Sequence, residues 1–277
     1  MPDKPKVRYG KSVRIVRMAV LLLLTGVFLY SGYKAANVYL TGKNEEEAFT
    51  KLAELVVFRK KNTVIKPNLP KEPPADTVVE TETTEVVSST LLYYEMNPDF
   101  TGWLSVPNTK INYPVMFTPD EPERYLHRAF DGTYSFSGTP FIGADCDVES
   151  DCFIIYAHNM KNGAMFGTLD RYAKAEFCGQ NPEFTFDTLY EERTYRVFSA
   201  FKGKIPKEGE AGFRWYDYVG NLDEAAFSEL ITEIENASLY KVGVKPVYGD
   251  QILLLSTCAY HAENGRFVVA AYRSVCE

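Results

Sequence analysis

A cysteine and an arginine stand at the facing ends of two apolar runs in the last part of the chain. The stretch QILLLSTCAYHAENGRFVVAAYR, residues 251–273, ends its first run at Cys258 and begins its second at Arg266. A thiol becomes a nucleophile when a base takes its proton, and a guanidinium can stabilise the charge on an attacked carbonyl oxygen. A buried cysteine in a plain hairpin is an equally good interpretation of these residues alone, because free cysteine packs as a small hydrophobic residue.

The base would be one of three histidines, His127, His158 and His261. His158 closes the apolar run CFIIYAH as Cys258 closes its own run, so two strand ends at one rim of a sheet would bring them together. His261 is the rival, because it follows Cys258 by only three residues. His127 lies in the stretch YLHRAF, where we expect a structural and not a catalytic role.

Alternation along the strands limits which side chains share a face with the thiol. If the first run stays extended through Cys258, Ser256 lies on the same face and Thr257 on the opposite one. Arg266 reaches the thiol only if its own face coincides with that of Cys258. The pairing register decides this, and the sequence leaves the register open.

The five cysteines show no regular disulfide framework. Their number is odd, so at least one thiol stays free in a monomer, and Cys258 is the expected one. Cys258 and His261 have the spacing of two metal ligands, but no suitable second pair follows. The sequence also lacks a P-loop and a dinucleotide-binding glycine motif. We therefore expect neither a metal nor a cofactor.

Positive charge gathers at the start of a chain of 277 residues whose net charge is −7. Residues 1–17 hold six Lys and Arg against one Asp, and the acidic remainder argues against nucleic acid as a partner. Residues 18–34 follow as an apolar stretch, MAVLLLLTGVFLYSGYK. This order predicts a cytoplasmic basic tail, a single transmembrane anchor and a catalytic domain outside the cell membrane. A cleaved signal peptide is the alternative, although no clean cleavage site ends the apolar run.

Composition divides the rest of the chain into three parts. Residues 35–63 contain apolar positions at helical spacing and predict a juxtamembrane helix. Residues 64–90 lose this periodicity and are rich in Pro, Thr and Glu, which is typical of an extended spacer. Residues 91–277 form the predicted folded domain.

Short runs of β-branched and aromatic residues predict the strands of this domain. They lie at 102–106, 110–115, 138–143, 152–158, 183–187, 194–203, 251–257 and 266–273. Short strands at close spacing indicate an all-β barrel or sandwich. An amphipathic helix capped by Asn221 is expected at 221–237, with shorter helices at 91–96 and 165–173.

Motifs in four places resemble the sortases, the cysteine transpeptidases of Gram-positive cell walls. LSTC followed by ENGRFVVAAYR resembles the active-site hairpin, and YAHNMKNGAMFGTL resembles the histidine segment of class B, with Ala157 where glycine is usual. NPDFTGWLSVPNTKINYPV and YLHRAFDGTYSFSGTPFIGAD resemble the opening strands of that class. The resemblance covers about residues 91 to 275. It implies an eight-stranded sortase-type β-barrel with short helices, here preceded by one transmembrane helix.

The resemblance also implies a role for each residue. Cys258 would be the nucleophile, His158 the general acid and base, and Arg266 the group that positions substrate and stabilises the oxyanion. Ser256 and Thr257 would line the substrate site.

The implied function is that of a membrane-anchored class B sortase. It would cleave the C-terminal sorting signal of secreted proteins through a thioacyl enzyme and transfer them to an amine of a peptidoglycan precursor. A pilin-polymerising sortase and an inactive sortase-like binding module are the alternatives. Intact cysteine, histidine and arginine positions argue against the inactive module.

Overall fold

A computed structural model describes residues 11–60, 88–207, 209–258 and 263–274 of the chain. The chain divides into two compact units, residues 1–47 and residues 48–277. Each is described by itself.

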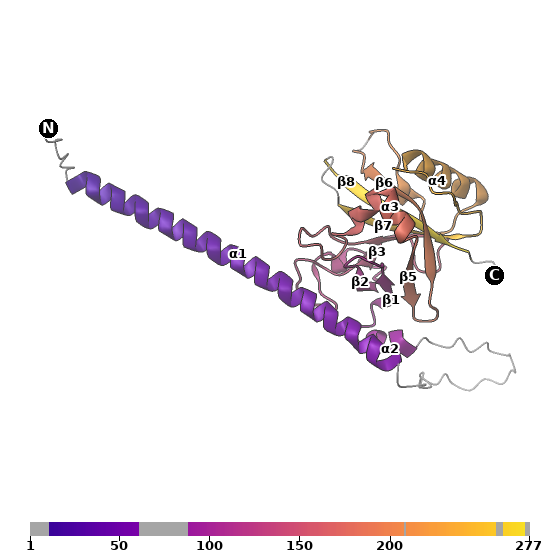
Figure 1. The fold of residues 1–277 in the computed structure, drawn as a ribbon, viewed down its shortest axis with the longest axis horizontal. Helices are drawn as coiled ribbons and strands as arrows, with labels where there is room; N and C mark the ends of the chain where they lie inside the picture. The colour runs from indigo at the N-terminus through magenta and orange to yellow at the C-terminus, as the bar shows by residue number, and fades with distance from the viewer. Residues whose placement is uncertain (1–10, 61–87, 208, 259–262, 275–277) are drawn as a thin grey trace. The chain divides into compact units, whose positions relative to one another are not determined.

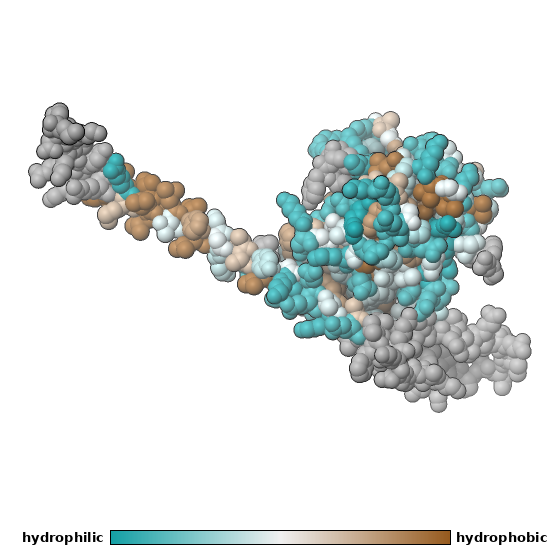
Figure 2. All heavy atoms as spheres, in the orientation of Figure 1, coloured by the Kyte–Doolittle hydropathy of each residue, from teal (hydrophilic) through white to brown (hydrophobic). Residues whose placement is uncertain are grey.

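The first unit is formed by a helix, α1 (Lys11–Lys60), whose last part belongs to the second unit. The sequence led us to expect separate anchor and juxtamembrane helices. No proline interrupts residues 11–60, so the helical hydrogen bonds continue without a break. Within the described residues, its stretch Ile15–Glu54 is the single helix long and apolar enough to cross a membrane. Figure 2 shows the hydrophobic side chains along the N-terminal half of α1.

The second unit is a closed barrel whose strands follow the order β1-β2-β3-β4-β7-β8-β6-β5 (Figure 1). This confirms the eight-stranded fold expected from the sequence. Neighbouring strands are antiparallel except for the parallel pairs β2/β3 and β4/β7. The strands are β1 (Phe100–Ser105), β2 (Asn112–Met116), β3 (Phe141–Ile142), β4 (Cys152–Tyr156), β5 (Glu183–Thr188), β6 (Thr194–Lys204), β7 (Gln251–Cys258) and β8 (Gly265–Arg273).

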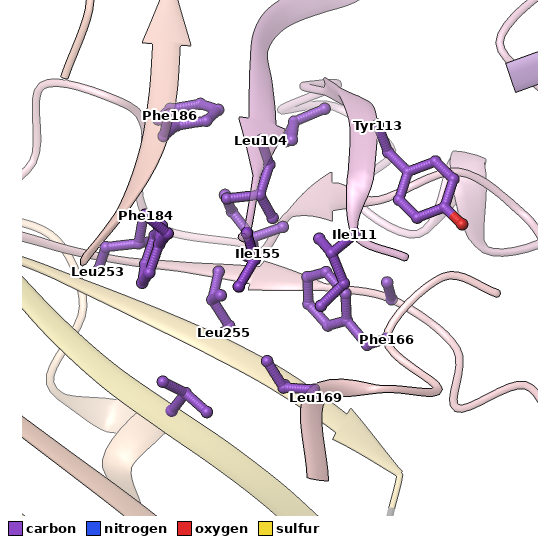
Figure 3. Packing of buried hydrophobic residues seen from close by; sticks show 14 of the residues in the cluster. Leu104, Ile111, Tyr113, Ile155, Phe166, Leu169, Phe184, Phe186, Leu253 and Leu255 are labelled. Carbon is purple, nitrogen blue, oxygen red and sulfur yellow. The ribbon is translucent and has the colours of Figure 1, made fainter. Parts of the chain in front are cut away.

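Strand β7 is buried on both faces. Leu253 and Leu255 lie inside the barrel, in a cluster that includes Ile155 (Figure 3). Ile252 and Leu254 lie on the other face, in a second cluster with the apolar side of helix α4. Two buried faces explain why this strand is continuously apolar instead of alternating.

The helix covering that outer face is α4 (Glu224–Ala237). Its buried side chains are Phe227, Leu230, Ile231 and Ile234, as the helical spacing predicted. The predicted cap was wrong: Asp223, not Asn221, accepts a hydrogen bond from the Ala226 backbone N–H at 2.8 Å. A carboxylate at that position also favours the positive end of the helix dipole.

Short helices fill the connections between strands. The expected helices at 91–96 and 165–173 are α2 (Ser88–Met96) and the 3-10 turn η2 (Leu169–Ala173). The sequence analysis missed three others: η1 (Arg124–His127), α3 (Ala175–Gln180) and η3 (Trp215–Asp217). They are six residues or shorter, too short to show helical periodicity.

The last part of α1 packs on the barrel within the second unit. Phe49 is 5% exposed and meets the ring of Tyr113 edge-to-face at 5.3 Å between centroids. The Tyr93 hydroxyl donates a hydrogen bond to the Leu52 carbonyl. The Tyr113 hydroxyl in turn accepts a bond of 3.2 Å from the Met165 backbone N–H. Residues that the sequence placed outside the folded domain therefore contribute to its core.

Candidate active site

The register of β7 and β8 brings Cys258 and Arg266 together. The two strands are antiparallel, and Cys258 pairs directly with Arg266 at the end of the ladder. Residues directly opposite in an antiparallel pair project from the same face, with Cβ atoms about 5 Å apart. The question that the sequence left open is thus settled, and the guanidinium and the thiol share one face.

A second register places His158 beside the same cysteine. Strand β4 runs parallel to β7, and Tyr156 pairs with Ser256 as the last of five matched positions. The chains stay adjacent beyond this pair, because the Asn159 side-chain amide donates to the Cys258 carbonyl at 2.8 Å. Continuing the register by two residues aligns His158 with Cys258. Histidine, cysteine and arginine therefore lie in a row across three neighbouring strands or their extensions.

The imidazole of His158 is held by a backbone carbonyl. Its Nε2 lies 2.9 Å from the Leu126 carbonyl oxygen, and the ring is half-buried. A carbonyl only accepts hydrogen bonds, so Nε2 carries the proton and Nδ1 of the neutral ring is available as a base. Burial lowers the pKa of His158, the Leu126 bond opposes this effect, and the neighbouring His127 lowers the pKa further. The ring therefore stays neutral and basic to lower pH than an ordinary histidine.

Among the four described cysteines, Cys258 alone is exposed, and all four are free thiols. Burial raises the pKa of Cys146 to about 11, and it also raises the pKa of Cys152 and Cys178. A buried thiol with a raised pKa is a poor nucleophile, because the thiolate is the reactive form. The expected free thiol is thus the accessible one, and Cys276 lies outside the described residues.

Arg266 is half-buried and not committed to an acidic partner. Its Nη1 donates to the Gly265 carbonyl at 3.1 Å, and no ion pair involves it within the described part of the chain. Burial raises the pKa of Tyr156 to about 12, and the Arg266 charge opposes that rise. Tyr156 thus lies within electrostatic range of Arg266. The guanidinium keeps its donors available for a ligand beside the thiol.

The two residues before the cysteine have different surroundings. The Thr257 hydroxyl donates to the Ala157 carbonyl at 2.7 Å and ties β7 to the end of β4. Ser256 is fully buried, and its hydroxyl has no hydrogen-bond partner in the described structure. Ser256 shares the face of Cys258 and Thr257 the opposite face, as alternation along the strand predicted.

Three features of the site were missed by sequence reasoning: the Leu126 carbonyl, Asn159 and Gly138. A Cβ on Gly138 would lie 2.4 Å from the Leu126 oxygen, and this residue has a φ of +64°. Only glycine adopts such a backbone readily while leaving that oxygen in place for His158. The glycine after SFS and the Asn after His158 were visible signals, but nothing local links them to the thiol.

The described residues contain no group of three or more His, Cys, Asp or Glu that could hold a metal ion. His261, the rival base and possible metal partner of Cys258, lies outside the described residues.

Comparison with known proteins identifies the family. The family model of the sortase domain matches residues 104–274, more than half of the chain. The chain belongs to the sortase family. Its relatives place it in class B: sortase B of Listeria monocytogenes is 26% identical over 255 residues, which cover 91% of this chain and 94% of the relative. Sortase B of Staphylococcus aureus is 24% identical, with the same coverage of 91% and 94%.

Solved structures of class B sortases share the fold. Sortase B from Bacillus anthracis gives a TM-score of 0.65 at 25% identity, covering 84% of this chain and 98% of that one. Staphylococcus aureus sortase B in a substrate complex gives 0.66 at 22% identity, covering 85% and 99%. As a class B sortase, the chain is a cysteine transpeptidase.

Proposed function

We propose that Cys258, His158 and Arg266 carry out the transpeptidation, as nucleophile, general acid–base and oxyanion-stabilising group respectively. The row that these residues form across β4, β7 and β8 is the observation that carries this assignment. Ser256 lines the substrate groove beside the thiol in the same proposal. Thr257 was predicted to line it too, but its bond to Ala157 suits a role in fixing the strands.

The chemistry follows from the groups present. His158 Nδ1 takes the Cys258 proton, and the thiolate attacks the peptide carbonyl carbon while Arg266 donates to the developing oxyanion. The carbon–nitrogen bond then breaks, and His158 returns the proton to the departing amine. An acceptor amine attacks the resulting thioester, its proton passes through His158 to the sulfur, and the carbon–sulfur bond breaks.

The substrate in this proposal is a secreted protein with a C-terminal sorting signal, and the acceptor is an amine of a peptidoglycan precursor. Helix α1 serves as the membrane anchor, with the basic residues 1–17 in the cytoplasm and the barrel outside. The length and composition of the stretch Ile15–Glu54 support this arrangement. Protease added to intact protoplasts should release the catalytic domain, and a protected domain would contradict the topology.

Mass spectrometry of the protein after exposure to a library of sorting-signal peptides tests the chemistry. We expect a thioacyl adduct on Cys258 and on no other cysteine. The adducts that accumulate would also identify the preferred motif. A protein that stays unmodified across the library would refute the proposed transpeptidase role of this row.

Two histidine variants test the base. His158→Ala should lower acylation by at least about 10²-fold, the usual contribution of a positioned acid–base group. His261→Ala is the matched control and should retain most activity. The reverse pattern would transfer the role to His261.

A further inference from the structure

The connection between β4 and η2, residues 157–168, contains the proposed base His158, and we call it the histidine loop. Its first part also contacts the nucleophile, because the Asn159 side-chain amide donates to the Cys258 carbonyl at 2.8 Å. A shift of this loop would therefore move the base and remove one support of the residue that carries the thiol.

The histidine loop folds back on itself. The Phe166 backbone N–H donates to the His158 carbonyl at 2.9 Å, and Asn159 forms an isolated antiparallel bridge with Met165. Met165 is 1% exposed and Phe166 is fully buried in the barrel core (Figure 3). The buried far side of the loop therefore determines where its first part lies.

Met165 has a backbone conformation that needs support. Its φ of +52° lies in the left-handed region, which is unfavourable for a residue with a Cβ. Its backbone N–H donates to the Tyr113 hydroxyl at 3.2 Å. A buried N–H is costly to leave without a partner, so this hydrogen bond stabilises the observed conformation of Met165.

The chain around Tyr113 holds the histidine loop at a second point. Lys110, two residues before β2, donates from Nζ to the Asn162 carbonyl at 3.3 Å. The Lys110 backbone N–H donates to the Thr168 hydroxyl, also at 3.3 Å. Tyr113 itself lies in β2 and pairs with Leu104 of β1. The start of β2 is thus the support on which the histidine loop rests.

The last part of α1 covers the Tyr113 ring. The rings of Phe49 and Tyr113 meet edge-to-face at 5.3 Å between centroids, and both side chains are 5% exposed. The Leu52 carbonyl, one turn further along α1, accepts a hydrogen bond from the Tyr93 hydroxyl. An edge-to-face pair has a preferred geometry, so Phe49 limits the positions that the Tyr113 hydroxyl can take.

We propose that Tyr113 is a positioning residue for transpeptidation and that Phe49 acts through it. The inference rests on the proposed function, since it concerns the loop of the proposed base. The Tyr113 hydroxyl holds Met165, and the histidine loop in turn holds His158 beside Cys258. The helix that carries the candidate membrane span therefore also supports the geometry of the active site.

Tyr113→Phe tests the positioning role, because it removes the hydroxyl and keeps the ring. Acylation of Cys258 by a sorting-signal peptide is measured with the full-length protein in detergent micelles. The kcat should fall about fivefold, the factor that corresponds to one lost hydrogen bond. The KM for the peptide should stay the same, because Arg266 and Ser256 lie on β7 and β8 and are not disturbed. Amide hydrogen exchange of residues 157–168, measured by mass spectrometry, should become faster.

Tyr195→Phe is the matched control. Tyr195 is also fully buried, and its hydroxyl donates to Gln251 Oε1 at 2.7 Å at the opposite end of β7 from Cys258. This variant loses a comparable hydrogen bond far from the histidine loop. It should melt at a similarly lowered temperature but keep the wild-type kcat and the wild-type hydrogen exchange of the loop.

A double-mutant cycle tests the role of α1. Phe49→Ala should lower kcat about threefold, as expected for the loss of one aromatic pair, whereas Lys51→Ala, at an exposed position of the same helix, should have no effect. If Phe49 acts through the Tyr113 hydroxyl, Phe49→Ala should add no further loss of kcat to Tyr113→Phe. Losses that multiply in the double variant would overturn the role assigned to Phe49.

The outcomes separate this inference from the proposed function. Absence of a Cys258 adduct in the wild type overturns both. Normal acylation by the wild type together with an unchanged kcat in Tyr113→Phe overturns the positioning role alone. An equal fall in kcat for Tyr195→Phe, or a rise in KM without a change in kcat for Tyr113→Phe, would also overturn it.

Discussion

The polar side chains at the two ends of the β7–β8 hairpin differ in how many hydrogen-bond and ion-pair partners they have. At one end Gln251 pairs with Arg273, and at the other Cys258 pairs with Arg266. Both pairs couple an arginine to a polar partner across the same two strands. The first end is a saturated buried network, whereas the second keeps its polar groups available.

Every group at the first end has several partners. The Arg193 side chain, only 2% exposed, lies 2.7 Å from Glu149 and also contacts Glu191. Arg273 donates to Gln251 at 2.8 Å and lies 3.0 Å from Glu191. A buried charge needs such partners, because transfer from water without them is costly.

The Cys258 end lacks comparable partners among the described residues. Arg266 bonds only to the carbonyl of the residue before it, and the buried Ser256 hydroxyl has no partner. Unpaired polar groups reduce stability, and they are retained where a ligand completes them. The comparison indicates that one end of the hairpin stabilises the fold, whereas the other end leaves polar groups available to bind a substrate.

Arg266→Lys should produce the largest effect. Lysine keeps the charge but loses the rigid fork of donors, so the acylation rate should fall on the order of 10²-fold, as when one oxyanion donor is removed. The melting temperature should stay the same, because the hydrogen bond of Arg266 within the described residues goes only to the adjacent Gly265 carbonyl. Arg273→Lys, at the other end of the same strand, should leave acylation unchanged. Near-wild-type acylation by Arg266→Lys would remove this residue from the catalytic set.

Arg193→Met should lower stability without a direct effect on catalysis. Removal of the buried guanidinium takes one donor away from Glu149, from Glu191 and from the Val148 carbonyl, and we expect a loss of about 2 kcal/mol. Thermal melting should show a decrease of roughly 4 to 8 °C. Arg196→Met changes an exposed arginine on β6, three residues after Arg193, and as the control it should melt like the wild type. If both variants melt alike, the buried network around Arg193 does not stabilise the fold.

Ser256→Ala and Thr257→Val form a contrasting pair. The Ser256 hydroxyl is buried without a partner, so its removal should stabilise the protein by about 1 kcal/mol while weakening sorting-peptide acylation. The Thr257 hydroxyl is bonded to Ala157, so its removal should destabilise by about 1 kcal/mol. Denaturant unfolding of both variants measures the two signs. Destabilisation by Ser256→Ala would show that its hydroxyl has a partner in solution.

His127→Gln should have the smallest effect, a shift in pH dependence. Burial and His127 both lower the pKa of His158, and burial is the larger cause. Without the neighbouring His127 ring, protonation of His158 becomes easier, and its pKa should rise. The acid limb of thioester hydrolysis, measured without added amine, should move to higher pH. A shift to lower pH would contradict the arrangement of these two rings.

Much of the fold was predictable because its signals are local. All eight strands and helix α4 were found from apolar runs and helical spacing, each within one segment of chain. The short helices η1, α3 and η3 and the packing of Phe49 on the barrel were not found from the sequence. A helix of three to six residues shows no periodicity, and the partner of Phe49, Tyr113, is far along the sequence.

The sequence by itself determined which chemistry is available: a thiol and a guanidinium at two facing strand ends, and three histidines as possible bases. Only the tertiary structure decided how they meet. The registers of β4, β7 and β8 placed His158 in line with Cys258 and Arg266 opposite it. The Leu126 carbonyl, from a different loop, selected the tautomer of His158. Residue types and strand periods are properties of short segments, whereas register and ring orientation depend on contacts between segments as far as 100 residues apart, which no local pattern encodes.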